Sequence, residues 1–342
     1  MPDSYLGEIR VFGGSFAPAG WAMCDGSLVS ISANAALFQL LGTTYGGDGT
    51  SSFALPDLRG RAPVHMGQGS GLSPRALGER GGAEAVVLQT AHLPAHSHAA
   101  LADDTVGNQS EPYQGTWAPS ALGQFSASSP SASMHPAAIA PSGDGFPHEN
   151  MPPFLVLNFI ISLAGAYPSP DRVELFEQYG GELRAFGFGF APAGWALCNG
   201  QLLAIAGNEA LFGVLGTRYG GDGTTTFALP DLQGRMPMQA GAGVAQGASG
   251  GEEGHALTIN ELPSHTHMPQ GSMNYAEDDS PANGVWANQD AFAAYSKRTP
   301  DAAMSTNAIA STGSNQPHEN MSPFQVVNYC IALQGVPPSQ AA

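Results

Sequence analysis

The sequence predicts a mainly β fold in which two tandem units each contain one short helix and long irregular loops. Three observations support this fold class. Gly and Pro are frequent, at 45 and 27 residues, and this composition favours turns and short strands over long helices. Apolar residues fall in short runs rather than in long helical stripes. Several motifs occur twice, which indicates an internal duplication.

The duplication sets the expected domain organisation. Motifs at a constant offset of 174 residues are FAPAGWA at 16–22 and 190–196, YGGDGT at 45–50 and 219–224, and FALPDL at 53–58 and 227–232. PHENM recurs at 147–151 and 317–321, an offset of 170. This period is too long for a solenoid or a propeller blade, which repeat every 20 to 50 residues or so. We therefore expect one unit at 1–167, a connector at 168–180 and a second unit at 181–338.

Each unit is expected to open with a β-hairpin. Asp25-Gly26 stands between two alternating apolar stretches, and Asn199-Gly200 stands at the same place in the second unit. Both dipeptides tolerate the positive φ angles of a type I′ turn. The turn chemistry therefore predicts that the strands before and after each dipeptide pair with one another.

A short helix is expected next in each unit. Asn34 precedes AALFQLL as a helix N-cap, and Gly42 is placed to end the helix in the left-handed conformation. Leu37, Phe38 and Leu41 would then share one face. EALFGVL repeats the pattern in the second unit, and a strand ending at the LPDL motif follows in both.

The end of each unit predicts a buried strand preceded by a long loop. PFLVLNFIISL and PFQVVNYCIAL are almost continuously apolar, so we expect strands with both faces covered. Ahead of them run roughly 35 residues rich in Ser, Ala, Asn, Pro and Gly without a clean period. Loops of this length are usually functional or disordered.

The charge balance excludes some partners. Acidic residues number 28 against 11 basic ones, for a formal net charge of −17. This field repels nucleic acid and anionic membranes, so we expect neither as a partner. The longest strongly apolar run is far shorter than the roughly 20 residues of a membrane span, and no secretory signal is visible. The three cysteines make no disulfide framework and are expected to be small buried residues of a protein made in the cytoplasm.

Two histidine pairs are the first candidate for chemistry. LPAHSH and LPSHTH place His96 with His98 and His265 with His267. In a strand such pairs would point to one face, and imidazole suits zinc, iron, nickel and copper. Two ligands are too few for a zinc site, which normally has four. The pairs are therefore either part of a shared metal site or ordinary turn residues.

Other motifs favour structural interpretations. PHEN places His148 and His318 beside glutamates, either as a binding edge or as solvated residues next to Asn150 and Asn320, which would cap a turn. The second is favoured. LPDLRGR suggests a bidentate Asp57–Arg61 ion pair that fixes a turn, in preference to an arginine site for an anionic receptor group. Asp48 and Asp222 in GGDG lack the spaced carboxylates of a calcium loop, and the sequence has no nucleophile elbow, P-loop or HExxH motif.

Taken together, four motifs resemble the phage tail collar domain. They are FAPAGWAMCDG, LGTTYGGDGTSSFALPDLRGR, LPAHSH and HENMPPFLVLNFII, and all four recur in the second unit. The family includes bacterial proteins called microcystin-dependent proteins and parts of phage short tail fibres. The resemblance implies a trimeric or fibre-forming surface protein that binds a receptor and is not an enzyme. The sequence departs from the usual pattern in its tandem arrangement and in Gln233, which replaces the arginine found at Arg59.

The resemblance also implies a role for the histidine pairs. Three chains around an axis would bring six imidazole nitrogens together at each pair, and the short tail fibres that the sequence resembles use His-X-His pairs in this way. We therefore expect His96, His98, His265 and His267 to bind a transition metal, zinc or iron, and we expect no organic cofactor. The expected assembly is a homotrimer or a multiple of three.

The loops at 99–147 and 268–316 are the expected receptor-binding surface. They contain Tyr113, Trp117, Tyr275 and Trp286, whose flat rings suit sugars, among Ser and Asn residues that suit polar edges. The leading hypothesis is a structural and receptor-binding protein of a phage tail, a tail-like particle or a bacterial surface fibre, with a cell-surface glycan or protein as receptor. A self-assembling fibre subunit and a fibre-borne polysaccharide-degrading enzyme are the alternatives, because carboxylates of a glycosidase site are assembled only in space.

Overall fold

A computed structural model gives the fold of the chain. It describes residues 4–96, 101–102, 108, 110, 116–118, 146–173, 178–240, 243–262, 271–275, 286–288, 295–296, 302–303 and 312–338. The chain divides into two compact units that differ from the sequence repeats, because each contains parts of both copies. The first, here the sheet unit, comprises residues 1–86, 149–254 and 319–342, and the second, here the insertion unit, comprises 87–148 and 255–318.

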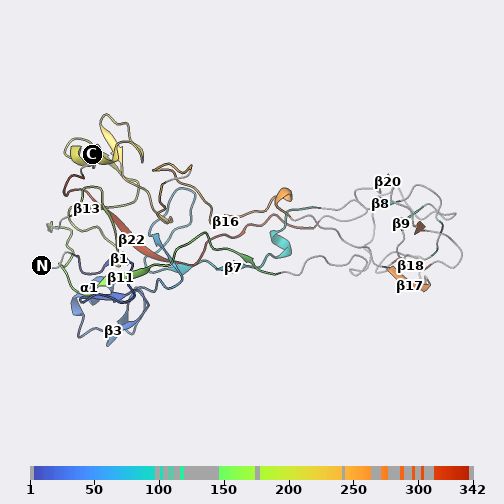
Figure 1. The fold of residues 1–342 in the computed structure, drawn as a ribbon, viewed down its shortest axis with the longest axis horizontal. Coiled ribbons are helices and arrows are strands. Elements are labelled where there is room, and N and C mark those ends of the chain that lie inside the picture. The colour runs from blue at the N-terminus through green and yellow to red at the C-terminus, as the bar shows by residue number, and fades with distance from the viewer. Residues whose placement is uncertain are drawn as a thin grey trace. The chain divides into compact units, whose positions relative to one another are not determined.

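The sheet unit is built on one sheet shared by both copies (Figure 1). The strand order along it is β13 (Trp195–Leu197), β22 (Phe324–Ala332), β12 (Leu183–Phe186), β1 (Glu8–Phe12), β11 (Asn158–Ser162) and β2 (Trp21–Met23). The order is symmetric, since each strand of the first copy has its counterpart at the same distance on the other side of the β1–β12 junction. All five junctions along this order are antiparallel.

Two further strands, β5 (Ala62–His65) and β6 (Arg80–Gly81), pair with β22 and complete this eight-stranded sheet. The smaller elements of the unit are α1 (Ala35–Leu41), α2 (Glu209–Leu215), the pair β3 (Leu28–Ser30) with β4 (Ser52–Ala54), the pair β14 (Leu202–Ala204) with β15 (Thr226–Ala228), and β7 (Ala85–Val86). Three two-residue strands, β10 (His148–Glu149), β16 (Gly254–His255) and β21 (His318–Glu319), fall where the chain passes from one unit to the other.

The insertion unit contains short strands and two single-turn helices. They are η1 (Thr90–His92), η3 (Ile259–Glu261), β8 (Leu101–Ala102), β9 (Thr116–Trp117), β17 (Gly271–Tyr275), β18 (Trp286–Asn288), β19 (Tyr295–Ser296) and β20 (Ala302–Ala303). β19, β9, β8 and β20 form one sheet with strands from both copies, and β17 pairs with β18. The long loops therefore contain paired strands that their composition did not predict.

One core serves both copies of the sheet unit. Leu37 and Leu41 of α1 are buried, as are Leu211 and Leu215 of α2, and all four belong to a single hydrophobic cluster. The Tyr45 hydroxyl donates a buried hydrogen bond of 2.9 Å to the Gly187 carbonyl oxygen, which links the copies further. The predicted fold class, mainly β with one α-helix per repeat, is confirmed for the described residues. The cysteines Cys24, Cys198 and Cys330 are buried thiols, as predicted.

The predicted helix ends are confirmed in position, but the hydrogen bond at the first and the backbone conformation at the last differ from the prediction. Asn34 is the N-cap residue of α1, but its side-chain amide donates to the Ser30 carbonyl oxygen instead of capping a helical N–H. Gly42 ends the helix with φ +54° and ψ −137°, which is not the left-handed helical conformation. Positive φ still explains why glycine stands there.

The predicted opening hairpins are wrong. β2 pairs with β11, while β3 pairs with β4, so the strands on the two sides of Asp25-Gly26 do not pair with one another. Gly26 does adopt φ +76°, but its N–H donates to the Pro56 carbonyl oxygen. The turn therefore connects β2 of the main sheet to β3 of a second ladder. β2 and β3 each pair with a strand from later in the sequence, β11 and β4, instead of with one another.

The prediction that both closing strands are covered holds for one copy only. All nine residues of β22 are buried, and its first half pairs with β5 and β6 of the first copy. The equivalent residues of the first copy, Phe154 to Leu157, lie outside any strand and are 46% to 82% exposed. The same pattern of apolar residues is therefore buried in one copy and open in the other.

A buried carboxylate holds the junction between the copies. Glu8 is fully buried, and its oxygens accept from the Tyr5 N–H at 3.0 Å and from Arg10 Nε at 2.5 Å. Arg184 of the second copy lies 3.4 Å from the same carboxylate. Glu182 is the repeat equivalent of Glu8 and accepts from the Tyr179 N–H and from Arg184 Nε, but its side chain is 30% exposed.

We predict that Glu8→Gln destabilises the sheet unit much more than Glu182→Gln. Removing this buried charge breaks its pairs with Arg10 and Arg184, at a cost of about 2–3 kcal/mol in free energy of unfolding. The more exposed Glu182 should cost less than about 1 kcal/mol, because water screens the change. Denaturant unfolding of both variants measures the difference, and equal losses would show that Glu8 does not hold the junction.

Candidate functional site: a histidine cluster

Four histidines from distant parts of the sequence meet in the insertion unit. The ring centroid of His318 lies 5.2 Å from that of His148, 5.8 Å from that of His255 and 6.2 Å from that of His92. The repeat equivalents His148 and His318 thus contact each other edge to face. His92 and His255 have no histidine at the equivalent positions, so the cluster is a product of the folded chain rather than of the duplication alone.

His318 is the centre of this cluster. It is only 5% exposed, and its buried Nδ1 has no hydrogen-bond partner among the described residues. Burial lowers the pKa of His318 below the usual histidine value, and the nearby His148, His255 and His92 lower that pKa further. A hydrogen bond with the backbone of His255 opposes them only partly. His318 is therefore held as a neutral imidazole near pH 7.

Two neighbours of His318 are oriented by the ends of the single-turn helices. His255 Nε2 lies 3.2 Å from Glu261 Oε1, and Glu261 also accepts from the Thr258 N–H at 2.7 Å to close a capping box on η3. His92 takes the place of that glutamate in the first copy, where its Nδ1 accepts from the Gln89 N–H at 3.1 Å. The residue that caps η1 is thus also a member of the cluster.

The cluster as folded is a set of packed imidazoles and not a ready metal site. Within the described residues, no three His, Cys, Asp or Glu side chains are arranged to hold a metal ion. With its Nδ1 occupied as an acceptor, neutral His92 has its proton on Nε2 and offers no second lone pair. What the arrangement can do is respond to acid, because protonation would bring several positive charges together.

Of the four predicted metal ligands, the structure describes only His96. The His96 N–H donates to the Thr312 carbonyl oxygen, and the Thr312 N–H donates to the His96 carbonyl oxygen, both at 2.9 Å. His96 therefore forms an isolated bridge and not a strand. Its Nδ1 lies 2.9 Å from the Pro94 carbonyl oxygen. Since that oxygen can only accept, Nδ1 carries the proton and Nε2 has the lone pair. His98, His265 and His267 lie outside the described residues.

The structure describes only some of the predicted receptor-binding residues. Trp117 lies in β9, half-buried, and pairs with Tyr295 of β19. Tyr275 and Trp286 belong to β17 and β18, whose backbones are described, and Tyr113 lies outside the described residues. The predicted solvated His318 is wrong, because it is buried in the cluster. Asn150 does not cap a turn but donates to the Ala83 and Met321 carbonyl oxygens, which ties the copies together.

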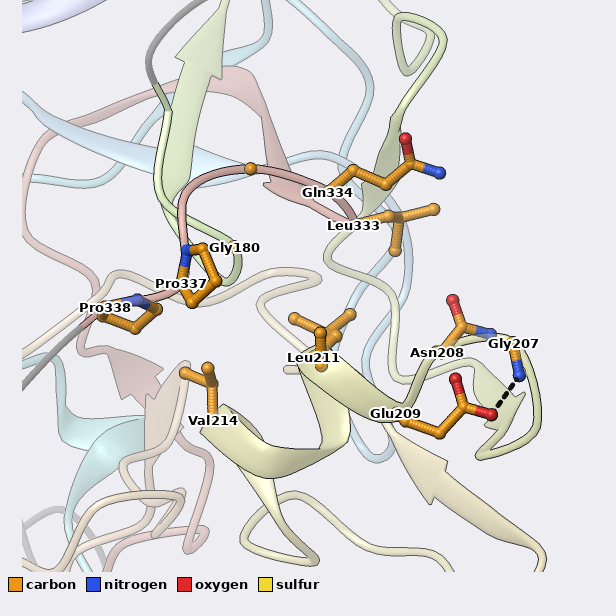
Figure 2. Close-up of a pocket in the computed structure, with 12 residues that line it drawn as sticks. Gly180, Gly207, Asn208, Glu209, Leu211, Val214, Leu333, Gln334, Pro337 and Pro338 are labelled. Carbon is orange, nitrogen blue, oxygen red and sulfur yellow. Dashed lines mark hydrogen bonds between the residues drawn. The ribbon is translucent and has the colours of Figure 1, made fainter.

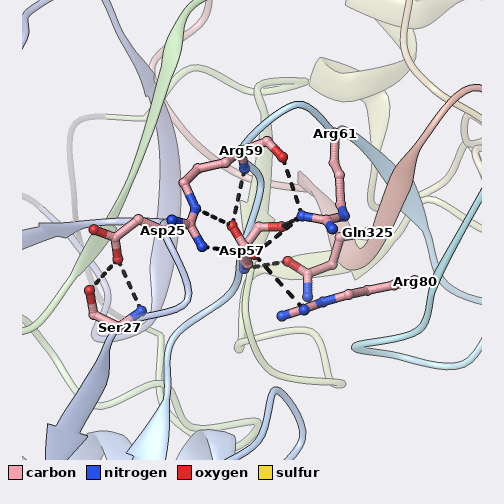
Figure 3. A network of polar contacts seen from close by, with 7 residues as sticks. All are labelled: Asp25, Ser27, Asp57, Arg59, Arg61, Arg80 and Gln325. Atoms are coloured by element: carbon pink, nitrogen blue, oxygen red, sulfur yellow. Dashed lines mark hydrogen bonds and ion pairs between the residues drawn. The ribbon is translucent and has the colours of Figure 1, made fainter. Parts of the chain in front are cut away.

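The predicted pair at Asp57 is structural, with a different arginine making the two-point contact (Figure 3). Arg59 reaches both Asp57 oxygens, at 2.8 and 3.2 Å, whereas Arg61 reaches one, at 3.2 Å. These contacts lower the pKa of Asp57, and the bond from the Arg59 side chain is the largest cause. The Asp57 N–H donates to Gln325 Oε1 at 2.6 Å, so this turn also anchors β22. The Asp57 carboxylate is therefore occupied by contacts within the chain.

Asp48 and Asp222 are turn residues as well. Asp48 Oδ1 accepts from three consecutive backbone N–H groups, at Thr50, Ser51 and Ser52, and the Ser51 hydroxyl donates to Oδ2. The Ser51 side chain and these N–H groups hold the pKa of Asp48 well below its usual range. Asp222 repeats the arrangement. Neither loop has carboxylates to spare for a cation.

A shallow pocket beside α2 offers little chemistry (Figure 2). Leu211 and Val214 form one wall, and Pro337 and Pro338 form another. Glu209 is the one charged residue that lines it, and its Oε1 accepts from the Gly207 N–H at 2.9 Å. The pocket has no group placed as an acid, base or nucleophile.

Sequence reasoning missed the histidine cluster for a physical reason. Its members are dozens to more than a hundred residues apart, so no local spacing links His92, His148, His255 and His318. The available signal was the repeated PHEN motif, together with a histidine in copy one where copy two has the capping Glu261.

Comparison with known proteins identifies the repeated segment. The family profile of the phage tail collar domain matches residues 7–63 and again residues 181–237. The two matches span β1 to β5 of the first copy and β12 to β15 of the second. No curated protein matches the chain. Among the described residues, no helix is long and apolar enough to cross a membrane.

We predict that acid weakens the insertion unit through His318. A histidine with a lowered pKa in the folded state protonates first in the unfolded chain, so stability is full above roughly pH 6.5 and falls as pH decreases below it. His318→Gln, which cannot protonate, should flatten this loss. Hydrogen exchange of peptides from residues 87–96, corrected for intrinsic rates, measures it at pH 7.5 and pH 5.

His65 provides the matched control in the sheet unit. It is 1% exposed, its Nδ1 accepts from the Tyr329 N–H, and burial lowers its pKa to about 4. His65→Gln, the residue that the second copy has at position 239, should flatten the acid loss in the sheet unit alone. If acid weakened residues 87–96 equally with and without His318, the cluster would not be the sensor.

Proposed function

The chain carries two tandem phage tail collar domains, and from this premise we propose that it is a structural and receptor-binding protein of a phage tail, a tail-like particle or a bacterial surface fibre. It assembles as a homotrimer or a multiple of three. It binds a cell-surface glycan or protein through the insertion unit and has no enzymatic role. Its final location is the tail, the particle or the cell surface.

The observation that supports this proposal is which of the two units contains the collar segments. Both collar matches fall within the sheet unit, and both stop before the insertion unit begins. A rigid scaffold that displays variable inserted segments is the usual arrangement of binding proteins. The collar segments therefore serve assembly, and the residues inserted between them serve recognition.

Aromatic residues of the insertion unit carry the proposed recognition. Trp117, Tyr275 and Trp286 lie on short paired strands, and Tyr113 lies in the same inserted segment. Tyr and Trp supply large contact area at low cost in conformational entropy, and the surrounding Ser and Asn residues supply hydrogen bonds. This combination suits the polar edges and apolar faces of sugars.

We predict that Tyr275→Ala and Trp286→Ala weaken binding to the receptor at least tenfold, the usual loss for an aromatic residue at the centre of an interface. Surface binding to a panel of bacterial cells and their purified polysaccharides measures the loss. Leu202→Ala is the control, since Leu202 is 62% exposed in the sheet unit and should be neutral.

Three outcomes of the same assay would go against the proposal. Undiminished binding by both aromatic variants would remove recognition from the insertion unit. Failure of the unchanged protein to bind any surface would favour a fibre subunit whose loops contact only other copies. Shortened polysaccharide would favour a fibre-borne enzyme.

We also propose that the His-X-His pairs hold a transition metal, zinc or iron, at the trimer axis. The contact between His96 Nδ1 and the Pro94 carbonyl oxygen supports this, because an Nδ1–H that donates to a carbonyl oxygen is the arrangement in which histidine binds metal through Nε2. Three chains contribute His96 and His98 to one site, and His265 and His267 to a second. The metal would hold together chains whose surfaces offer few ion pairs.

We predict that His96→Ala with His98→Ala removes half of the bound metal, and that changing all four residues removes the rest. Elemental analysis combined with native mass gives the stoichiometry, with two metals per trimer for separate sites and one or fewer for a mixed site. Metal content should fall below roughly pH 6.5, because histidine must be neutral to bind.

A cluster variant provides the control for metal content. His255→Gln should leave the metal in place, because His255 is not one of the proposed ligands. Loss of metal in His255→Gln, or a purified protein that takes up no zinc or iron when offered either, would contradict the assignment.

A further inference from the structure

The first copy exposes a strand that the second copy buries. Phe154 to Leu157 are 46% to 82% exposed and pair with no strand among the described residues, although their repeat equivalents Phe324 to Val327 form the buried start of β22. There, Val326 pairs with Val64 in a parallel ladder with β5. An apolar segment with unsatisfied backbone groups is a template for another strand. We call residues 154–157 the donor segment.

The second copy exposes the counterpart of β5. Residues 236–239 are the repeat equivalents of 62–65, yet they form no strand, and Met238 is 77% exposed. We call residues 236–239, together with Gly250 and Gly251, the acceptor segment. One chain therefore contains both halves of a second ladder and leaves both unpaired within the described residues.

Two glycines show what the acceptor segment is shaped to receive. Gly81 and Gly82 of the first copy lie so close to β22 that an added Cβ would fall 2.6 Å from the Phe324 ring and 2.1 Å from the Ser322 carbonyl oxygen. Their equivalents are Gly250 and Gly251, where an added Cβ would meet nothing within 4 Å. Gly251 nevertheless keeps φ +86°, close to the +76° of Gly82. The backbone of the acceptor segment therefore has a conformation that allows another strand to approach closely, but no strand does so among the described residues of one chain.

A hydrogen bond is incomplete in the same place. The Asn150 amide bridges the Ala83 and Met321 carbonyl oxygens at 3.1 Å each, which ties the first copy to the segment leading into β22. The equivalent Asn320 amide donates to the Glu252 carbonyl oxygen, at 3.1 Å. The repeat equivalent of the second acceptor is the carbonyl of Met151, which precedes the donor segment by three residues. The gap thus coincides with the missing strand.

We propose that the donor segment pairs with the acceptor segment of a second copy of this chain, in the parallel register that β22 and β5 use within one chain. Within one chain the closing strand of copy two pairs with copy one, and the equivalent pairing of copy one with copy two is absent among the described residues. The donor and the acceptor segment that this leaves open would let further chains close a ring or extend a fibre. The proposal rests on the proposed homo-oligomer and names the surface that builds it.

Crosslinking tests the register directly. The ladder of Val326 with Val64 places Val156 opposite Met238, at a strand spacing of about 4.8 Å that a disulfide can bridge. Chains with Val156→Cys and chains with Met238→Cys are co-expressed with different tags and then oxidised with oxidised glutathione. We expect a disulfide between the two kinds of chain. Leu28→Cys with Leu202→Cys is the control, because both leucines are exposed and no ladder joins them.

A steric variant tests the same surface without cysteine chemistry. Gly250→Leu meets nothing in one chain, so it should fold, but it would occupy the space that the Phe154 ring needs. We expect the native mass to fall to a smaller assembly or to a single chain. Gly213→Leu in α2, where an added side chain also meets nothing, should keep the full mass.

The outcomes separate this inference from the proposed function. An oligomer that forms no Val156–Met238 crosslink and tolerates Gly250→Leu would overturn the ladder and leave the proposed assembly standing. A single-chain mass for the unchanged protein would overturn both. A disulfide formed only within one chain, in a variant that carries both cysteines, would show that the donor segment closes on its own acceptor and would also overturn the proposal.

Discussion

The antiparallel pairing of β1 with β12 is the constraint on which the rest of the structure depends. It places Ile9 opposite Ala185 and Glu8 opposite Phe186, and so joins the first strand of one copy to the first strand of the other. The Glu8 carboxylate is then buried with arginines from both copies around it. The remaining strands follow outward on each side of this junction in the same order. The duplicated sequence thus folds as one shared sheet and not as two beads on a string.

The copies differ despite their similar sequences and the symmetric strand order of the shared sheet. Among the described residues, only one of the two equivalent closing-strand junctions forms. Copy two finds β5 and β6, and its Gln325 accepts from the Asp57 N–H. Copy one has Leu155 at that position and stays open. An apolar side chain in place of the amide cannot make this bond, so any ladder that the donor segment forms lacks this one contact.

The sequence predicted what depends on local chemistry. The short helices, the buried cysteines and the repeat itself follow from periodicity, composition and identity of motifs, and the collar resemblance agrees with the two matched segments. The hairpin at Asp25-Gly26 failed, because positive φ fixes a turn but does not decide which strand wins the edge beside it. The exposed donor segment was equally invisible, since its apolar pattern matches that of β22. Which strands pair with one another depends on the whole fold and is not visible in the local sequence.

The candidate site shows the same limit. His96 was visible from its spacing to His98, whereas the cluster around His318 combines residues separated by most of the chain. Its chemistry follows from burial and neighbouring imidazoles, which only the folded chain brings together. Local motifs therefore pointed to a metal site, and the three-dimensional arrangement adds an acid-sensitive cluster beside that expectation.

The most direct test of a sheet shared by both copies is to cut the connector. A specific protease site placed within residues 168–180 allows the folded protein to be cleaved between the copies, and native mass is then measured without denaturant. The shared sheet predicts that the two halves remain together at the mass of the uncut protein, because β1–β12 and β22–β5 both cross the cut. Two halves that separate and each keep a cooperative unfolding transition would contradict it.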